Sequence, residues 1–272
     1  MLSNLYPTFL ILICTIDISR EFGNFNPQRR PQVMGDLIPF RSLSTHRKRI
    51  QDKIVLYHNF FRTQVSPPAA NMLRMKWHKG AAKAAQKWAD ECMMLNHDNT
   101  TGRFIKEYGS CGQNIFIASH KVPWLFAIKT WWLEKDLFTF GTKNNLTLVG
   151  HYTQMVWAAT HEVGCGVTKC NHFGNFTGKV YYNYVCNYCP IGNRPKRVGK
   201  PYRRGKPCNS CKKHCHHGKL CKNVCAYADQ WANCRQLYKY SPGWLCYTDT
   251  AEGRDRARNC SAACFCKRKI HD

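Results

Sequence analysis

The sequence contains few acidic residues and no long apolar run. Only 16 Asp and Glu oppose 41 Lys and Arg, which gives a formal net charge of +25 at pH 7. An apolar segment at residues 9–16 is too short to cross a bilayer, and no later stretch reaches the roughly 18 apolar residues that a membrane-spanning helix needs. We therefore expect a soluble mature protein whose surface attracts acidic partners.

The sequence motifs of common hydrolases are also missing. No Gly-x-Ser-x-Gly motif and no His-Glu-x-x-His motif occurs. His161 and Glu162 begin like the second motif, but Cys165 stands where its second histidine would be. These absences predict a protein without enzymatic activity.

Cysteine, in contrast, is abundant and falls into two sets. Six cysteines lie between Cys92 and Cys189, and ten lie between Cys208 and Cys266. Even counts suit closed disulfide sets, which are typical of secreted proteins, and the second segment has too little apolar mass to fold without crosslinks. The alternative is a set of reduced, zinc-bound cysteines, since Cys-x-x-Cys occurs at 186–189 and 208–211. The remaining spacings do not match a paired zinc ribbon.

The N-terminal residues predict secretion. Residues 9–16 lie where the hydrophobic region of a signal peptide belongs, although no Lys or Arg precedes them. We assign residues 1–20 to a signal peptide, cleaved between Ser19 and Gly23. Residues 21–49 are rich in Pro, Asn and Arg and are expected to form an exposed leader, trimmed after Arg30 or near Arg49. The mature chain is expected to be extracellular.

Hydrophobic periodicity predicts helices early in the domain and strands late. Apolar residues at three- and four-residue steps indicate a helix from residue 50, ended by Pro67, a second at 80–95 and a third at 123–136. The second has a small-residue face that would pack closely on a neighbour. Residues 155–159, 162–167 and 180–186 are strand-like, with a turn at 171–179. This order predicts an α+β fold.

Positive charge is concentrated after residue 190. Residues 191–272 hold 19 Lys and Arg against 5 Asp and Glu, and residues 194–222 hold eleven basic residues and no acidic one. One interpretation is a solvated surface. Another is attraction to sulfated glycans, an anionic lipid surface or a channel vestibule lined with carboxylates. Nucleic acid is not an expected partner of a secreted chain.

Two sequence motifs stand out: residues 150–157 read GHYTQMVW, and residues 184–193 read YVCNYCPIGN. They resemble the first and second signatures of the CAP superfamily, which comprises cysteine-rich secretory proteins, antigen 5 and pathogenesis-related 1 proteins. His58, Asn59 and Arg62, with VSPPAANML at 65–73, are similar to its opening helix and loop. The arrangement of six and then ten cysteines, with CFCKRKI at 264–270, resembles the cysteine-rich secretory protein subfamily.

The resemblance implies an α-β-α sandwich followed by a hinge and a small helical module. We assign residues 50–190 to the CAP domain, 191–224 to the basic hinge and 225–272 to a module similar to ion-channel regulators and ShK-like toxins. The subfamily also implies eight disulfides. The implied pairs are Cys92–Cys170, Cys111–Cys189, Cys165–Cys186, Cys208–Cys215, Cys211–Cys221, Cys225–Cys266, Cys234–Cys260 and Cys246–Cys264.

A cleft with two His and two Glu is implied by the same resemblance. Its residues here are His97, Gln113, Glu134 and His151, so that Gln113 replaces one of the glutamates. Two neutral imidazoles can hold zinc, and nearby carboxylates can balance its charge. We expect no required cofactor and at most weak or conditional zinc binding at His97 and His151. A structural role without metal, and a hydrolase based on His151 and Glu134, are the alternatives.

The crosslinked tail is the expected binding surface. Aromatic side chains beside cations suit an acidic, partly apolar target such as the outer mouth of a calcium or potassium channel. The candidate residues are Arg203, Arg204, Lys212, Lys213, Tyr238, Tyr240 and Trp244. Alternatives are sterol or lipid carriage by the CAP domain and adhesion to cell-surface glycans in reproduction or host interaction. The protein is expected to be a monomer, with glycosylation sequons at Asn99, Asn145 and Asn175.

Overall fold

The computed structural model describes residues 37–173 and 176–271. The expected signal peptide, most of the expected leader and the sequon residue Asn175 lie outside these residues. Within the described part of the chain, no helix combines the length and the apolarity needed to span a bilayer.

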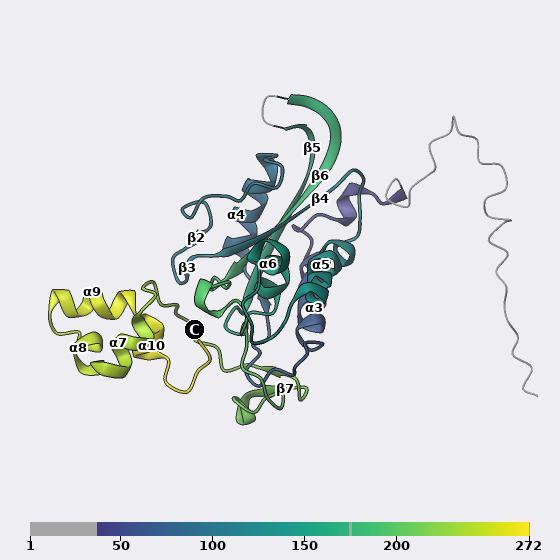
Figure 1. Cartoon of the computed structure of the whole chain (residues 1–272). Helices are drawn as coiled ribbons and strands as arrows, with labels where there is room; N and C mark the ends of the chain where they lie inside the picture. Colours follow the sequence, from purple (N-terminus) through teal and green to yellow (C-terminus); the bar gives the residue numbers. More distant parts are fainter. Residues whose placement is uncertain (1–36, 174–175, 272) are drawn as a thin grey trace, which may run out of the picture. The chain divides into compact units, whose positions relative to one another are not determined.

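A four-stranded sheet forms the centre of the sandwich (Figure 1). Its strands lie in the order β1 (Lys76–Trp77), β5 (Glu162–Phe173), β6 (Phe176–Cys189) and β4 (Gly112–Ala118). Strand β1 runs parallel to β5, and the other two pairings are antiparallel. The predicted strands at 162–167 and 180–186 are therefore confirmed as parts of a longer hairpin. Strand β4 was not predicted.

One face of the sheet is covered by a single helix, α4 (Lys79–Asp90). Its buried residues are Ala81, Ala85 and Ala89, which confirms the predicted small-residue face. The helix approaches the sheet closely because β5 has glycines opposite it. A Cβ atom at Gly164 would lie 2.1 Å from the backbone nitrogen of Ala82, and one at Gly166 would lie 2.3 Å from the Cα of Gln86. Any larger residue at these two positions would push helix and sheet apart.

Three helices cover the opposite face: α3 (Lys48–Arg62), α5 (Trp124–Leu133) and α6 (Leu146–Met155). A 3-10 turn, η2 (Glu134–Leu137), follows α5 directly. The main apolar cluster of the protein lies on this face, where helical residues such as Ile54, Ile128 and Trp131 pack with Tyr184 of β6. Aromatic contacts bind the layers together, as in the edge-on packing of Trp124 against Tyr184 at 5.1 Å.

A buried arginine ties α3 to the loop that follows α6. Arg62 is 1% exposed, and its guanidinium donates hydrogen bonds of 2.7–3.2 Å to five backbone carbonyls. The accepting residues are Leu73, Met155, Trp157, Ala158 and Thr160. Burial lowers the pKa of Arg62 to about 9. The charge is thus compensated by peptide dipoles, and the arginine fixes the shape of two loops.

The expectation of an exposed leader is wrong for its last residues. Leu43 is 2% exposed and Thr45 is 6% exposed, and a 3-10 turn, η1 (Phe40–Ser42), precedes them. Trp124 donates its indole N–H to the carbonyl of Leu43 over 2.8 Å. Lys48 and Arg49, proposed as a trimming site, belong to the first turn of α3. This segment has no periodic hydrophobic pattern, because single apolar residues such as Leu43 fill gaps in the helical layer.

The predicted strand at 155–159 is also wrong. Met155 ends α6, and the next residues form a buried turn whose carbonyls accept the bonds from Arg62. A short apolar run is compatible with a strand or with any buried segment, so periodicity alone could not separate the two. Helix α6 itself starts where the side chain of Asn145 accepts a hydrogen bond from the N–H of Thr147 at 3.0 Å.

The hinge, residues 191–224, lies against the loop at 68–74 of the sandwich. Backbone hydrogen bonds join Ala70 to Arg203, Ser210 to Ala70 and Cys221 to Met72 at 2.8–3.0 Å. The hinge contains a short two-stranded sheet and two 3-10 turns. These are η3 (Pro195–Arg197), η4 (Lys212–His214), β7 (Cys215–His216) and β8 (Leu220–Cys221). A further small sheet, β2 (Phe104–Ile105) with β3 (Gly109–Ser110), lies within the sandwich domain.

The C-terminal module, residues 225–271, consists of four short helices. They are α7 (Cys234–Tyr240), α8 (Pro242–Cys246), α9 (Ala251–Asn259) and α10 (Ser261–Phe265). Its core is small: Leu245, Ala257 and Ala263 are buried together with Cys234, Cys260 and Cys264. Ala228 joins a second cluster with Ala81, Ile105 and Tyr108 of the sandwich domain.

Eight disulfides crosslink the described residues. They are the eight pairs implied by the family resemblance, three in the sandwich, two in the hinge and three in the module. In the part of the chain that the structure describes, none of them joins the sandwich to the hinge or to the module. Each segment is therefore closed on itself, as the even cysteine counts suggest.

Candidate functional site

The four residues of the histidine site, His97, Gln113, Glu134 and His151, come from four different segments. His97 follows α4 in a loop, Gln113 lies on β4, Glu134 begins η2, and His151 lies in the middle of α6. The structure joins them in two hydrogen-bonded pairs, His151 with Glu134 and His97 with Gln113, and His151 lies close enough to His97 to influence it electrostatically.

Glu134 orients His151 with both of its carboxylate oxygens. Oε1 accepts from Nδ1 of His151 at 2.5 Å, and Oε2 accepts from the backbone N–H groups of His151 and Tyr152 at 2.9 and 3.0 Å. The ring of Trp131 lies nearly parallel to the His151 ring, with centroids 6.3 Å apart. Because a carboxylate only accepts, Nδ1 of His151 must carry the proton.

Gln113 holds His97 in a similar way, but without a charge. Its Oε1 accepts from Nδ1 of His97 and from the backbone N–H of Asp98, both at 3.0 Å. Its Nε2 donates to Oδ1 of Asn187 on β6 at 3.0 Å. The N–H of Asp98 must face an oxygen, which fixes the orientation of the amide and makes Nδ1 of His97 a donor. Asn187 was not identified from the sequence, although it lies within the second signature.

Both imidazoles are therefore oriented with Nδ1 as donor and Nε2 as the remaining acceptor. Partial desolvation lowers the pKa of His97, and the positive charge of Arg103 lowers it further, while the hydrogen bond to Gln113 acts in the opposite direction. A neutral imidazole with a free Nε2 can accept a proton or bind a metal ion.

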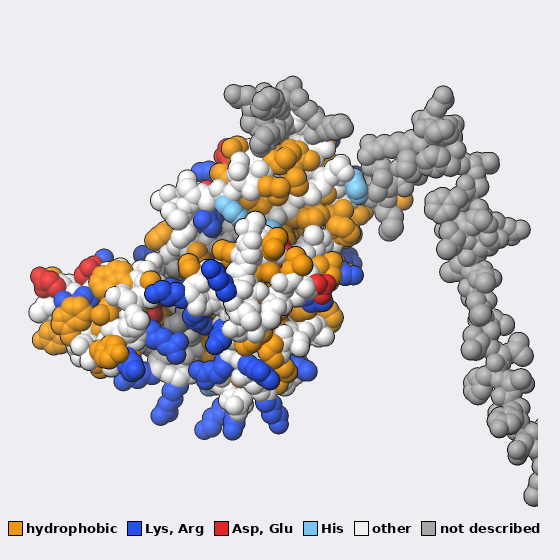
Figure 2. Space-filling view, viewed as in Figure 1, with side chains coloured by type: hydrophobic (Ala, Val, Ile, Leu, Met, Phe, Trp, Pro, Cys, Tyr) orange, Lys and Arg blue, Asp and Glu red, His pale blue; other side chains and the backbone are white. Residues whose placement is uncertain are grey.

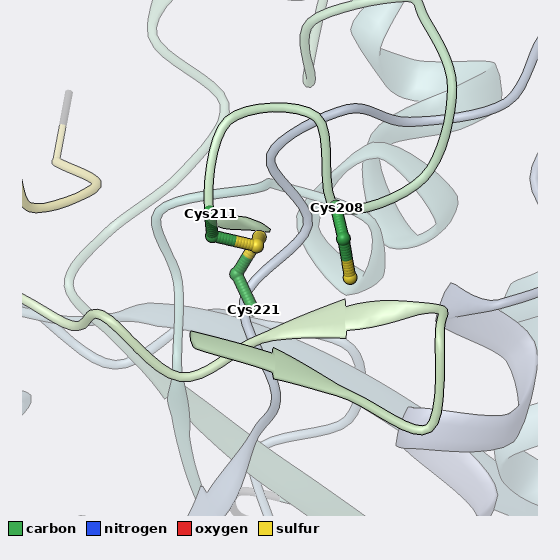
Figure 3. Close-up of side chains that lie close together, drawn as sticks. All are labelled: Cys208, Cys211 and Cys221. Carbon is green, nitrogen blue, oxygen red and sulfur yellow. A yellow bond between two sulfur atoms is a disulfide. The ribbon is translucent and has the colours of Figure 1, made fainter. Parts of the chain in front are cut away.

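A second group of potential metal ligands lies in the hinge (Figure 3). Among the described residues, only Cys208, Cys211 and Cys221 form a group of three or more ligand atoms within 4.8 Å of one another. Cys211 is bonded to Cys221, however, and Cys208 is bonded to Cys215. Oxidised sulfurs cannot act as thiolate ligands, so the structure does not support the zinc-bound alternative for these cysteines.

The histidine site contains no nucleophile activated by a base. Within the described residues, neither His97 nor His151 forms a hydrogen bond with a serine hydroxyl or a thiol. The sixteen cysteines from Cys92 to Cys266 are all in disulfides. A hydrolase of the Ser–His or Cys–His type has no support from this arrangement.

The aromatic candidates of the C-terminal module differ in exposure. Tyr240 is 77% exposed and Trp244 is 52% exposed, whereas Tyr238 is half-buried and packs against the core of the module. The guanidinium of Arg256 lies 4.3 Å from the centroid of the Trp244 ring, and the ammonium of Lys239 lies 5.5 Å from that of Tyr240. Arg256, which is not among the residues predicted from the sequence, is thus part of this surface.

The basic candidates of the hinge are all accessible. Arg203, Arg204, Lys212 and Lys213 are exposed. Figure 2 shows Lys and Arg side chains gathered over the hinge near β7, while apolar side chains are prominent on the C-terminal module. The basic and the aromatic candidates thus belong to two different surfaces, whereas the sequence predicted a single binding surface.

The described sequon residues lie at the surface. Asn99 and Asn145 are exposed, and each uses Oδ1 as a local acceptor: Asn99 from Gly102 at 2.7 Å and Asn145 from Thr147. Their Nδ2 atoms, to which a glycan would be attached, form no hydrogen bond within the described residues.

A layered α-β-α sandwich with this histidine site, continued by a separately crosslinked helical module, defines a CAP protein with a cysteine-rich extension. Family models match both parts: the cysteine-rich secretory protein family (CAP) matches residues 55–188, and Crisp matches residues 208–271. The chain belongs to the cysteine-rich secretory proteins.

Individual relatives agree with this assignment. Cysteine-rich secretory protein 2 of Cavia porcellus is 39% identical over 234 residues, which are 85% of this chain and 89% of that protein. Cysteine-rich secretory protein 2 of Homo sapiens is 38% identical and covers 85% of this chain and 90% of that protein. The solved structure of NaASP2 with Zn2+ has a TM-score of 0.51 at 29% identity, covering 65% of this chain and 96% of that one.

Proposed function

We propose that this protein is a secreted, non-enzymatic effector that binds a membrane protein from the extracellular side and modulates it. The target class that the surface fits best is an ion channel, with calcium and potassium channels first. Secretion is supported by the dense disulfides and by the secretory relatives. The lack of an activated nucleophile in the described residues supports a binding role.

The C-terminal module is rigid, which favours a role in binding. Three disulfides close its four short helices, so its exposed side chains are held in place before a partner arrives. A preorganised surface loses less conformational entropy on binding than a flexible one. The module can therefore present a small set of anchor side chains to a protein target with little loss of conformational entropy.

The observation that carries the proposal is the pairing of exposed aromatic rings with cations. Trp244 is half exposed although its ring is large and apolar, and Arg256 covers one side of it at 4.3 Å. Tyr240 is almost fully exposed beside Lys239. Tryptophan, tyrosine and arginine are the residues most enriched among binding hot spots, and cations complement a channel mouth lined with carboxylates.

The proposal is tested by patch-clamp recording with the full-length protein on a panel of calcium and potassium channels. We expect a change in current at micromolar protein or below. On the responding channel, Trp244→Ala and Tyr240→Ala should each raise the half-maximal concentration by about tenfold or more, as expected for hot-spot residues. Phe126→Ala is the matched control, because Phe126 is a 55% exposed aromatic residue of the sandwich.

Two outcomes would contradict the proposal. One is the absence of any current change across the panel. The other is an equal loss of effect in Phe126→Ala and in the two module variants, which would mean that the module does not provide the contact surface.

A second function, conditional zinc binding, is favoured by the geometry of the histidine site. Both Nδ1 atoms are bound to oxygen acceptors, which is the way that metal-ligating histidines are commonly oriented. His97 and His151 would bind the ion through Nε2, with water completing the shell. Two protein ligands are fewer than the three or four of most zinc sites, so we propose weak binding. NaASP2, solved with Zn2+, is a relative at 29% identity.

Zinc titration by calorimetry tests this second function. His151→Gln should abolish the binding heat, and Gln113→Glu should tighten binding, because a carboxylate beside His97 compensates the charge of the ion. Unchanged zinc affinity in His151→Gln would exclude the site.

A further inference from the structure

A broad basic groove lies between the hinge and the end of the C-terminal module. Its volume is about 560 Å³. One wall contains Lys200 and Arg203 of the hinge, and the other contains Arg235 of α7 and residues 267–269. Half-buried Asn71, Ser210 and Tyr238 also line it. Arg203 and Lys267 are more than sixty residues apart in the sequence, and only the fold brings them together.

The described charged side chains of this groove are of one sign. Lys200, Arg203, Arg235, Lys267, Arg268 and Lys269 are all exposed, and none of the described residues that line the groove is Asp or Glu. None of these six side chains forms a salt bridge with an acidic residue that the structure describes. Cations that face one another across a groove repel, so an anionic ligand would relieve this repulsion as well as form new contacts.

The C-terminal wall is held firmly in place. Cys266 is bonded to Cys225, and the chain then turns through Arg268, whose φ is 60°. Asn223 fixes this turn with two hydrogen bonds. Its side-chain Nδ2 donates to the backbone carbonyl of Arg268 at 3.1 Å, and its backbone carbonyl accepts from the N–H of Ile270 at 2.9 Å. Three consecutive basic side chains are thus displayed on a preorganised turn, and little order would be lost on binding.

The size and composition of the groove indicate the class of ligand. Its volume is within the range of about 300–1,000 Å³ that is common for small-molecule sites, and it far exceeds a single sulfate or phosphate. Neutral polar groups of Asn71 and Ser210 can bind hydroxyl groups, and the partly buried Tyr238 adds an aromatic side chain to the lining that a sugar unit can contact. A flat membrane could not enter between two walls, whereas a polysaccharide chain could.

We propose that this groove binds a sulfated polysaccharide chain of the extracellular matrix or cell surface. The cations of the two walls bind sulfate and carboxylate groups on opposite sides of the chain, and the polar residues and Tyr238 bind its sugar units. The site shares no residue with the Tyr240 and Trp244 surface, so it does not depend on the proposed channel target. Of the basic candidates named from the sequence, it includes Arg203 alone.

Calorimetry with a defined heparin oligosaccharide at physiological salt tests the proposal on the full-length protein. The groove variant combines Lys267→Gln, Arg268→Gln and Lys269→Gln. The control variant combines Lys212→Gln, Lys213→Gln and Lys222→Gln, which are exposed and lie outside the groove. Both variants lose three positive charges, so their net charges are equal. A second groove variant, Lys200→Gln with Arg203→Gln, changes the opposite wall and leaves the crosslinked turn intact.

We expect both groove variants to lose affinity by about tenfold or more and the control by less than about threefold, because only the groove variants remove cations that contact the bound chain. A chemically desulfated oligosaccharide should not bind measurably. Equal losses in the groove and control variants would show that binding follows net charge, and would overturn the proposal. Wild-type binding to phosphatidylserine vesicles that is as tight, and as sensitive to the groove variants, would also overturn it.

Discussion

The sandwich and the C-terminal module stabilise their chains by different means. The largest fully buried side chains of the described residues all belong to the sandwich, among them Trp131, Trp157 and Tyr184. The module buries Leu245, two alanines and three cysteines in its core cluster. The sandwich therefore depends on apolar burial supported by a few hydrogen-bond networks, whereas the module depends on crosslinks.

This difference has a consequence for the surface of each part. Because disulfides replace an apolar core, the module does not need its aromatic residues inside. Tyr240, Trp244 and Tyr247 are each about half exposed or more. In the sandwich, by contrast, most tryptophans are buried, and the polar residues of the histidine site are held in pairs. The crosslinked part is thus better suited to present anchors to a partner.

The largest effect is expected from removing the arginine that organises the sandwich. Arg62→Met would remove the charged donor from five buried carbonyls, of which only those of Trp157 and Ala158 have a further backbone N–H donor among the described residues. Since an unsatisfied buried acceptor costs about 1–3 kcal/mol, we expect a loss of about 5 kcal/mol or more in the free energy of unfolding. Chemical denaturation measures this loss. Arg49→Met, an exposed change on the same helix, should stay within about 0.5 kcal/mol, and a similar effect of the two changes would contradict the assigned role.

Removing one disulfide from each part tests the comparison directly. Cys225–Cys266 closes a separation of 41 residues and Cys165–Cys186 one of 21, so each should contribute about 3–4 kcal/mol through chain entropy. The effect of losing the disulfide on the folded state should differ between the two parts, because only the sandwich has a large apolar core that keeps it folded without the crosslink. We expect Cys225→Ser with Cys266→Ser to make residues 225–272 protease-sensitive.

The matched variant is Cys165→Ala with Cys186→Ala. It should lower the melting temperature of the sandwich and leave its digestion pattern unchanged. If both double variants were digested in the same way, the module would have an independent source of stability and the comparison would fail.

A smaller loss of stability is expected when the pH falls, and it should affect the sandwich. His58 is fully buried: its Nδ1 donates to the carbonyl of Ile54 at 2.8 Å, and its Nε2 accepts from the hydroxyl of Tyr188 at 2.9 Å. Burial lowers the pKa of His58 from 6.5 to about 4. The unfolded chain therefore takes up a proton first as pH falls. The contribution of His58 to the free energy of unfolding should therefore decrease between about pH 6.5 and pH 4, by about 3 kcal/mol, and remain level below.

The difference between wild type and His58→Gln isolates this contribution. Unfolding free energies measured from pH 7 to pH 4 should show a difference that shrinks as the pH falls. A difference that stays constant over this interval would contradict the assignment. The module contains a single histidine, His271, so its own unfolding should depend much less on pH in this range.

Local patterns predicted those elements whose residues repeat at a regular step. The alanine face of α4 and the β-branched and aromatic residues of β5 and β6 are of this kind. Strand β4 was missed because its first residues are polar: Gln113 and Asn114 form buried hydrogen bonds to Asn187 and Tyr188 of the neighbouring strand. Their partners belong to another strand, so the segment itself contained no apolar alternation.

The same distinction holds for the candidate sites. His97 and His151 were found through motifs, but the atoms that orient them were not. The donor role of Nδ1 follows from Glu134 and Gln113, and the orientation of Gln113 follows from the N–H of Asp98. Hydrogen-bond partners distant in the chain cannot be read from a local pattern.

The sequence by itself determined the two sets of oxidised cysteines, the excess of positive charge and the family, because these depend on residue type, count and spacing along the chain. Only the tertiary structure decided that the aromatic and basic residues form separate surfaces, and that Lys200 and Arg203 face residues 267–269 across one groove. The physical reason is that electrostatic and hydrogen-bond partners are defined by distances in space, and crosslinks such as Cys225–Cys266 set those distances.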